Sequence, residues 1–160
     1  SQISNQLFSI SPRAVDLDEF VINLHEQLII MYPRRRITIN HTVRKGKIVF
    51  DQDRILQAVH NLVSNAVKNS PNESIHEISI LEGEKDLLIV VQDYGVGIPF
   101  QNIFQIFQPF SHIDTPYSST GSGLGLYVVK NIVLAHGGVG EVFSQENVGT
   151  TITIKVPLRT

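Results

Sequence analysis

Two glycine clusters and one aspartate are the residues of this chain best suited to binding a ligand. The first cluster, 93–99, reads Asp-Tyr-Gly-Val-Gly-Ile-Pro, and the second, 121–126, reads Gly-Ser-Gly-Leu-Gly-Leu. Because glycine lacks a Cβ, its backbone N–H can approach phosphate oxygens closely. Ionised Asp93 only accepts hydrogen bonds, which suits an exocyclic amine such as that of adenine, although most Asp-x-Gly sites simply cap their own turn. Together the clusters predict a site for a phosphorylated ligand.

A second group of polar residues has helical spacing. Asn61, Asn65 and Lys68 stand at i, i+4 and i+7 and therefore share one face of a helix. Asparagine is a mediocre helix former, so two of them one turn apart favour a role for their side chains. Carboxamide oxygens can hold Mg²⁺ and a lysine can meet a phosphate. The alternative, that these groups satisfy nearby backbone or water, stays open.

Further candidates flank these groups. Gly121, Gly123 and Gly125 precede a helix, whose first N–H groups form an anion site. Thr150 follows a glycine at the start of the last strand and is a candidate phosphate or sugar contact. Three phenylalanines recur every third residue, which indicates a core stripe that could also anchor a lid: Phe104, Phe107 and Phe110. The six histidines have no metal-ligand spacing and are interpreted mostly as surface or hydrogen-bonded core residues.

Composition excludes several classes of protein. The 160 residues are 42% hydrophobic with a net charge of −2, which predicts one globular domain without the basic footprint of a nucleic-acid-binding protein. The only basic cluster, residues 34–36, is interpreted as a solvated turn. There is no cysteine and no apolar run that could span a bilayer. We therefore expect a cytoplasmic domain that makes no membrane contact itself, either free or cut from a membrane-anchored parent.

The first half of the chain predicts two helices and a hairpin. Asp16 and Glu19 form a capping box for a helix that Pro33 ends. A strand near 37–39 is expected to form a hairpin with residues 47–50. Asp51 or Asp53 then caps a long second helix, which ends at 69–71.

The second half predicts four strands and a third helix. Strands are expected at 75–82 and 86–92, followed by a short helical or irregular segment at 100–110 and a flexible polar segment at 111–120. The second glycine cluster opens a third helix, which ends at His136-Gly137-Gly138, and strands near 139–143 and 150–157 complete the chain. We interpret residues 1–13 as a linker segment and 14–160 as one domain.

Four motifs in this order resemble the sequence boxes of sensor histidine kinases. They are Asn61 to Ala66 with Asp53-Arg54-Ile55 ahead of it, Asp93 to Pro99, Phe104 to Phe110, and Gly121 to Leu126. The resemblance covers nearly the whole chain from about residue 14 and identifies it as a catalytic ATP-binding domain. It implies the Bergerat fold, an α+β two-layer sandwich with a mixed sheet of about five strands faced by three helices. The predicted elements independently fit that architecture.

The resemblance also implies roles for individual residues. Asn65 would be the principal Mg²⁺ ligand with Asn61 assisting, and Lys68 would touch phosphate; these three are the candidate catalytic residues. Asp93 would bind the adenine amine. The implied ATP-binding residues are Asn61, Asn65, Lys68, Asn69, Asp93, Gly95, Gly97, Ile98, Phe107, Gly121, Ser122, Gly123, Leu124, Gly125, Leu126 and Thr150. Two positions depart from the family: Asn69 replaces an aromatic residue or histidine, and Tyr94 replaces an asparagine.

The implied reaction is transfer of the γ-phosphoryl group of Mg-ATP to a histidine. Related ATPases carry a glutamate general base where this chain has Asn61, and a neutral amide cannot take a proton from water. No phosphoacceptor motif is present, so the acceptor is expected on a separate or adjacent helical dimerisation domain, with a response regulator downstream. The alternatives are a degenerate nucleotide-binding regulatory module or, less favoured by Asn61, an ATPase of the superfamily.

Overall fold

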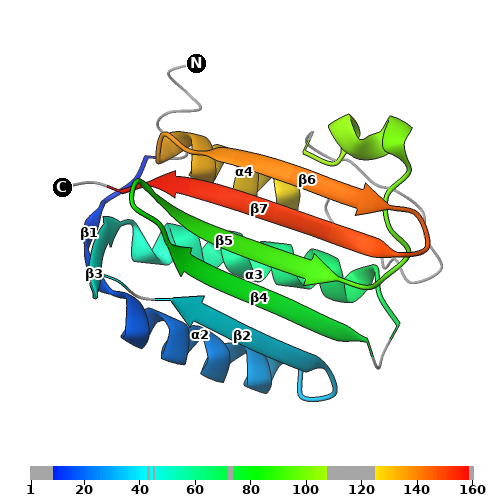
Figure 1. Ribbon diagram of the computed structural model, residues 1–160, viewed down its shortest axis with the longest axis horizontal. Helices are drawn as coiled ribbons and strands as arrows, with labels where there is room; N and C mark the ends of the chain where they lie inside the picture. Colours follow the sequence, from blue (N-terminus) through cyan, green and yellow to red (C-terminus); the bar gives the residue numbers. More distant parts are fainter. Residues whose placement is uncertain (1–8, 43, 45, 72–73, 108–124, 159–160) are drawn as a thin grey trace.

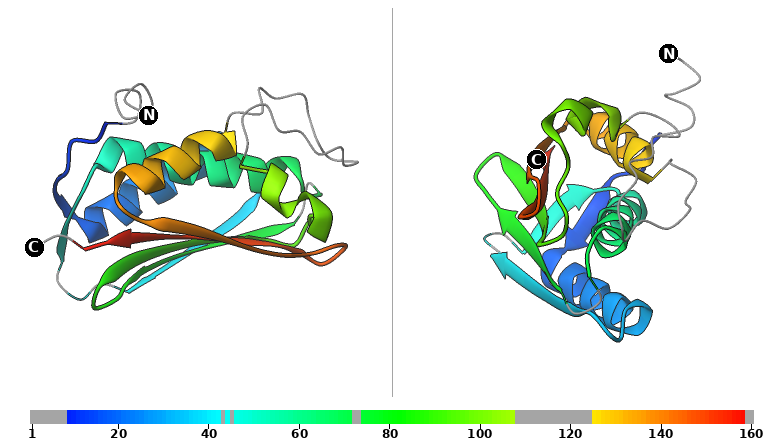
Figure 2. Two further views of the ribbon diagram at one scale, coloured as in Figure 1. Left: turned by 90° about the horizontal axis from the view of Figure 1, so that it is seen from above. Right: turned by 90° about the vertical axis from the view of Figure 1, so that its right-hand side faces the viewer.

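The fold has two layers, a sheet and a set of helices that covers one of its faces (Figures 1 and 2). The computed structural model describes residues 9–42, 44, 46–71, 74–107 and 125–158. Three helices lie on the same side of the sheet, and Figure 2 shows them side by side above it. This arrangement confirms the predicted α+β sandwich.

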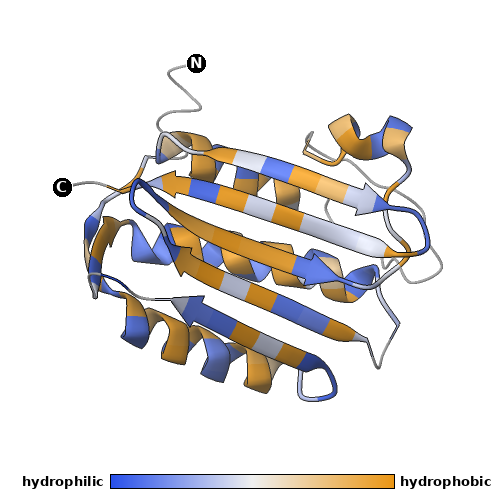
Figure 3. Cartoon of the chain, viewed as in Figure 1, coloured by the Kyte–Doolittle hydropathy of each residue, from blue (hydrophilic) through white to orange (hydrophobic). Residues whose placement is uncertain are grey.

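The main sheet has five strands in the order β2-β4-β5-β7-β6. Their bounds are β2 (Arg36–Thr42), β4 (Ile75–Glu82), β5 (Asp86–Asp93), β6 (Val139–Gln145) and β7 (Gly149–Pro157). β2 is parallel to β4 and the other pairs are antiparallel. Along β4, β5 and β7 every second residue is buried under the helices. Figure 3 shows apolar and polar bands alternating along β7.

The predicted hairpin of residues 37–39 with 47–50 is wrong. β3 (Lys47–Phe50) pairs antiparallel with β1 (Arg13–Asp16), a strand that the sequence analysis did not predict. β2 instead joins β4 in parallel, with α3 (Gln52–Lys68) in the connection between them. Parallel strands need such a crossover, usually helical, whereas a hairpin needs only a short turn. The alternation along 37–39 shows a strand but not its partner.

Helix starts follow the predicted caps. The Asp16 side chain accepts a hydrogen bond from the Glu19 N–H at the start of α2 (Leu17–Met31), and Asp51, not Asp53, caps α3 through the Arg54 N–H. The third helix, α4 (Gly125–Ala135), ends where Gly137 adopts a φ of +76°. Leu24, Leu62 and Ile89 are among the fully buried residues between the layers.

The segment after the first glycine cluster is a short 3-10 helix, η1 (Phe100–Gln105). The interpretation of Phe104, Phe107 and Phe110 as a core stripe is wrong for Phe104, which is 82% exposed, because no residue of η1 is buried and the first buried residue, Ile106, follows it. Phe107 packs against the core as expected. Phe110 and the segment 111–120 lie outside the described residues.

Within the described part of the chain, no helix has the length and apolar character needed to cross a bilayer.

Candidate functional site

The predicted site residues that the structure describes meet at one end of the sheet, on the side of the helices (right-hand end in Figure 1). They come from the second half of α3, the end of β5, the loop after it, and the first residues of β7 and α4. Backbone hydrogen bonds join these parts: the Val96 N–H donates to the Asn69 carbonyl at 3.2 Å. Gly121, Ser122, Gly123 and Leu124 lie outside the described residues.

The asparagines of α3 are held by specific contacts. Asn61 Nδ2 donates to the Gly125 carbonyl at 3.2 Å, which ties α3 to the first residue of α4. Asn69 Nδ2 donates to the Asn65 backbone carbonyl at 2.8 Å and lies 3.4 Å from Asn65 Oδ1. Lys68 is exposed in the last turn of the helix. Asn61 and Asn65 therefore lie one turn apart on the same face of α3, and Asn61 contacts the start of α4.

A row of polar residues crosses four neighbouring strands at this end of the sheet. The register pairs Ser144 of β6 with Thr150 of β7, Thr150 with Asp93 of β5, and Asp93 with His76 of β4. We call these four residues the polar row. The next helix-facing row inward is entirely apolar and consists of Val142, Ile152, Val91 and Ile78. The polar row thus lies at the end of the sheet that carries the predicted site, while Glu82 is a further buried polar residue of this face at the other end of β4.

Hydrogen bonds connect most of the polar row to the loop after β5. Ser144 Oγ lies 2.8 Å from Thr150 Oγ1 and accepts a hydrogen bond from the Ile98 N–H at 2.7 Å. Asp93 Oδ1 accepts from the Gly95 N–H at 2.9 Å. Thr150 thus lies directly opposite Asp93, and the loop that contains Ile98 is fixed to the same row of residues. Ser144 was not among the predicted site residues, because only the strand register shows its position.

Asp93 is a buried carboxylate, 6% exposed. Its burial raises its pKa to about 6, although hydrogen bonds from the Gly95 and Thr150 backbone oppose this shift. The charged form therefore lacks part of the stabilisation that water would give it. A ligand that donates a hydrogen bond to this carboxylate would supply it.

His76 is the second residue of the polar row, after Ser144, that sequence reasoning missed. It is fully buried, and neither ring nitrogen has a hydrogen-bond partner in the described part of the chain. Burial, aided by the positive charge of Arg35, lowers its pKa to about 4, so the ring is neutral at pH 7. The expectation that core histidines are hydrogen-bonded holds for His136 and fails for His76. The sequence did contain a signal for its burial: His76 stands two and four residues before Ile78 and Ile80 of β4, so the three side chains share one face of the strand.

Close backbone packing explains the first glycine cluster. A Cβ on Gly95 would lie 2.2 Å from the Asn69 carbonyl oxygen, and one on Gly97 would lie 2.2 Å from that of Gln145. Gly97 also has a φ of +72°, which side chains rarely adopt. The glycines thus let the loop lie between the end of α3 and the β6–β7 turn. Their described role is to shape the site, and the contact of their N–H groups with phosphate stays a prediction.

The remaining described candidates have mixed positions. Leu126 is buried in α4 and Ile98 packs against the core. Tyr94 is exposed and hydrogen-bonds to Glu77, which faces away from the helices, so its side chain lies on the outer face of the sheet. The substitution of asparagine by Tyr94 therefore adds no side chain to the helix-facing side of the site.

One arginine of the basic cluster 34–36 is not simply solvated. Arg35 Nη1 donates to the Pro71 carbonyl at 2.7 Å and to the Ser70 carbonyl at 3.3 Å. These carbonyls directly follow α3, where a positive charge is favourable. Arg35 therefore fastens the end of the helix that carries Asn65 and Asn69, and the interpretation of the cluster as a solvated turn is wrong for this residue.

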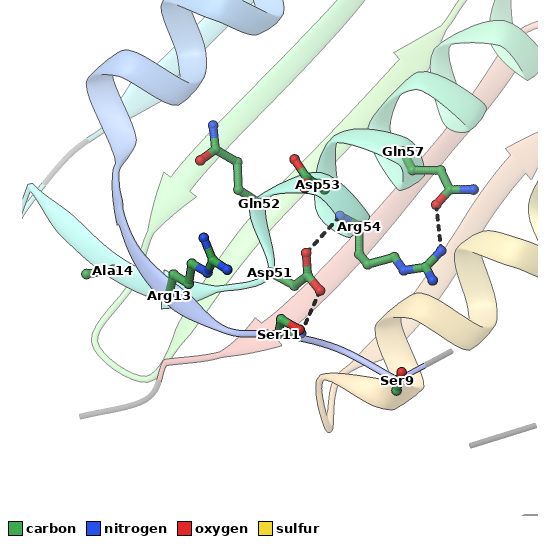
Figure 4. Close-up of a pocket in the computed structure, with 9 residues that line it drawn as sticks. All are labelled: Ser9, Ser11, Arg13, Ala14, Asp51, Gln52, Asp53, Arg54 and Gln57. Carbon is green, nitrogen blue, oxygen red and sulfur yellow. Dashed lines mark hydrogen bonds between the residues drawn. The ribbon is translucent and has the colours of Figure 1, made fainter. Parts of the chain in front are cut away.

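A polar pocket of about 620 Å³ lies at the opposite end of α3 (Figure 4). It is lined by Ser9, Ser11, Arg13, Ala14, Asp51, Gln52, Asp53, Arg54 and Gln57. Asp51 and Asn65 are separated by about 20 Å along the helix, at 1.5 Å per residue. None of the predicted site residues lines this pocket, so it is separate from the candidate site.

The donors and acceptors of the site fit a magnesium-bound nucleotide. Neutral carboxamide oxygens on α3 are ligands that Mg²⁺ accepts without losing its attraction for phosphate. A buried carboxylate beside them suits a base amine. The fold and the site thus define a class: α+β sandwiches with a candidate nucleotide site between the helices and one sheet end.

Comparisons with known proteins name the family. Residues 50–160 match the family of histidine kinase-, DNA gyrase B- and HSP90-like ATPases, and the chain belongs to it. It is 35% identical over 150 residues to the sensor histidine kinase WalK of Bacillus subtilis, covering 91% of this chain and 23% of that protein. It is 31% identical over 147 residues to the sensor-like histidine kinase SenX3 of Mycolicibacterium smegmatis, covering 90% of this chain and 38% of that protein.

Solved structures agree with this membership. The mycobacterial sensor histidine kinase MprB superimposes with a TM-score of 0.78 at 28% identity, over 93% of this chain and 99% of that chain. The catalytic domain of histidine kinase ThkA has the same fold, with a TM-score of 0.79 at 22% identity over 92% and 96% of the two chains. The identification as a catalytic ATP-binding domain of the histidine kinase type is thereby confirmed.

Proposed function

We propose that this domain binds Mg-ATP and transfers the γ-phosphoryl group to a histidine on a helical dimerisation domain. In this reaction an imidazole nitrogen of the acceptor attacks the γ-phosphorus. The bond from that phosphorus to the β–γ bridging oxygen breaks, and ADP leaves. Such transfer needs positioning and charge neutralisation more than acid–base chemistry. The family match over residues 50–160 and the relatives among sensor histidine kinases support it.

The buried carboxylate is the observation that carries the nucleotide assignment. Asp93 is nearly inaccessible and has its pKa raised to about 6, so a ligand amine that donates to it would relieve an unfavourable charge. The exocyclic amine of adenine has this chemistry. Thr150, Gly95, Gly97 and Ile98 would surround the base, and we assign the triphosphate to the α3–α4 side of the site.

The cation and phosphate roles belong to α3. Asn65 would be the principal ligand of Mg²⁺, Asn61 a second one, and Lys68 a phosphate contact. The metal, when bound, would neutralise charge that develops on the transferred phosphoryl group. Asn69, Phe107, Gly125 and Leu126 would line the remaining walls. We extend the binding site to Gly121, Ser122, Gly123 and Leu124 on the strength of their sequence motif alone.

Asn61 favours transfer to a protein over hydrolysis. A general base must accept a proton from the attacking water, and a carboxamide at neutral pH does not. The Asn61 side chain is moreover held by the Gly125 carbonyl through its Nδ2 group. The proposal also includes the acceptor domain and a response regulator downstream of it. It places the domain in the cytoplasm, with the parent protein either anchored in a membrane or not.

The test is to mix this chain with radiolabelled ATP, Mg²⁺ and the helical segment that neighbours it in its parent protein. The expected product is acid-labile phosphate on that segment, and it should be lost in Asn65→Ala. Lys85→Ala, at the far end of the sheet, is the matched control. Steady phosphate release without labelled segment would indicate an ATPase, and nucleotide binding without either would indicate a regulatory module.

A further inference from the structure

We propose that His76 is a positioning residue of the base site that donates a ring N–H to the Asp93 carboxylate when a nucleotide is bound. The inference rests on the proposed function, because it assigns a role at the same site. It adds a residue of β4 to a site otherwise formed by α3, α4, β5, β6 and β7.

The strand register brings the two side chains within reach. His76 and Asp93 are directly opposite each other on adjacent antiparallel strands, and both belong to the helix-facing set of residues. Opposite residues in such a pair have Cβ atoms about 4.5–5.5 Å apart. A change of side-chain rotamer is therefore enough to bring an imidazole nitrogen to a carboxylate oxygen. In the structure described here the two groups are not hydrogen-bonded, and Asp93 accepts from the Gly95 N–H.

A purely structural role explains His76 poorly. A fully buried side chain with two unpartnered nitrogens destabilises a fold, because these atoms lose their hydrogen bonds to water. Its neighbours on the same face of β4, Ile78 and Ile80, pack there without this penalty. An isoleucine at position 76 would fit the same pattern. The polar ring thus departs from the apolar pattern of this face directly opposite Asp93, and Glu82 at the far end of β4 is the other buried polar residue of the same face.

The charges around the ring favour donation. The low pKa of His76 leaves the imidazole neutral, with one N–H and one lone pair. Asp93 must stay ionised to accept the amine of a base, while its burial favours the protonated form. A further donor stabilises the charged carboxylate and fixes its orientation. His76 would therefore act on nucleotide affinity through Asp93, without touching the reacting atoms.

The experiment compares His76→Leu with His76→Gln, which keeps a donor, by titration calorimetry with Mg-ATP. We expect the affinity of the leucine variant to fall about tenfold, as for one hydrogen bond to a charged group. The glutamine variant should stay within about threefold of the original chain. Ile78→Val, one position along the same face, is the matched control for core perturbation and should leave the affinity unchanged.

A second measurement does not depend on any variant folding. The imidazole ¹⁵N signals of His76 in the original chain, assigned by NMR, should shift when Mg-ATP is added. Unshifted signals, or a leucine variant that binds ATP as the original chain does, overturn the inference while leaving the proposed function intact. A chain that binds no ATP overturns both.

Discussion

At the scale of single residues, the carboxylate of Asp93 opposes folding at neutral pH. Its pKa in the folded protein, about 6, lies above the ordinary value of 3.8. The folded state therefore holds more protons than the unfolded state between these values, and the contribution of Asp93 to stability falls as the pH rises through this window. The site retains an unfavourable buried charge that a ligand can use.

Replacing this carboxylate should separate stability from binding. We expect Asp93→Asn to raise the free energy of unfolding by about 3 kcal/mol at pH 7, because the pKa is raised from 3.8 to about 6 and one pKa unit corresponds to about 1.4 kcal/mol. At pH 4, where the native carboxyl is protonated, the gain should nearly vanish. Nucleotide affinity should fall in the same variant. Urea denaturation at both pH values with calorimetry checks this, and equal gains at both would contradict it.

Gly97 of the first cluster and Gly137 after α4 allow a comparison between conformational strain and steric overlap. Gly97 and Gly137 both have positive φ, +72° and +76°, but only at Gly97 would a Cβ meet another backbone. We expect Gly97→Ala to cost more than about 2 kcal/mol and to abolish ATP binding, and Gly137→Ala to cost about 1 kcal/mol and preserve it. Denaturant unfolding and calorimetry measure the two effects. Similar losses in both variants would rule out the packing argument.

The sequence alone predicts candidate site residues whose neighbours are close along the chain. Asn61 and Asn65 share a helix face by spacing, and Asp93 stands at the edge of a glycine turn. His76 and Ser144 were not predicted, because only the pairing of strands across the sheet brings them into the polar row. Residue types show what a side chain can do, whereas register decides which side chains it meets.

At the scale of elements, Asp51 joins three parts of the chain. Its side chain accepts hydrogen bonds from the N–H groups of Arg54 at the start of α3 and of Ser11 ahead of β1, as Figure 4 shows. Its own N–H donates to His136 Nε2 after α4, and the other ring nitrogen, Nδ1, donates to the Ile132 carbonyl. This joint closes the end of the domain that lies away from the candidate site.

Removing the side chain tests the joint. Asp51→Ala should lower the free energy of unfolding by about 2 kcal/mol, since it removes the N-cap of α3 and the bond to Ser11 together. Asp53→Ala, in the same helical turn but exposed, should cost less than about 1 kcal/mol. Chemical denaturation of both variants checks the difference. An equal loss would show that helix-dipole charge, and not the joint, matters here.

Elements with strong local signals were predicted well. The capping residues Asp16 and Asp51 and the glycine at 137 marked helix ends, and the polar turn at 82–85 separated β4 from β5, which is largely an aliphatic run. β1 has only four residues and no such signal. The wrong hairpin had a different cause, because β2 and β3 are consecutive and look like partners, while their true partners lie more than thirty residues away in the chain.

At the scale of the whole molecule, the site depends on the packing of both layers. A ligand that binds only the folded state should therefore stabilise the entire domain. With Mg-ATP at one hundred times its dissociation constant, we expect a gain of about 2.7 kcal/mol and a rise in Tm of about 5–10 °C. Differential scanning calorimetry checks this, with Asn65→Ala as the variant expected to show little rise. An unchanged Tm of the original chain at saturating nucleotide would contradict it.

The turn between β4 and β5 lies at the far end of the same two strands that carry His76 and Asp93. Over seven residues this separation is about 24 Å. Because the pairing of the strands is set along their length, a longer connection at 83–85 need not move the polar row. This turn is thus a place where a fluorescent reporter or new chain termini can be engineered while the candidate site keeps its geometry.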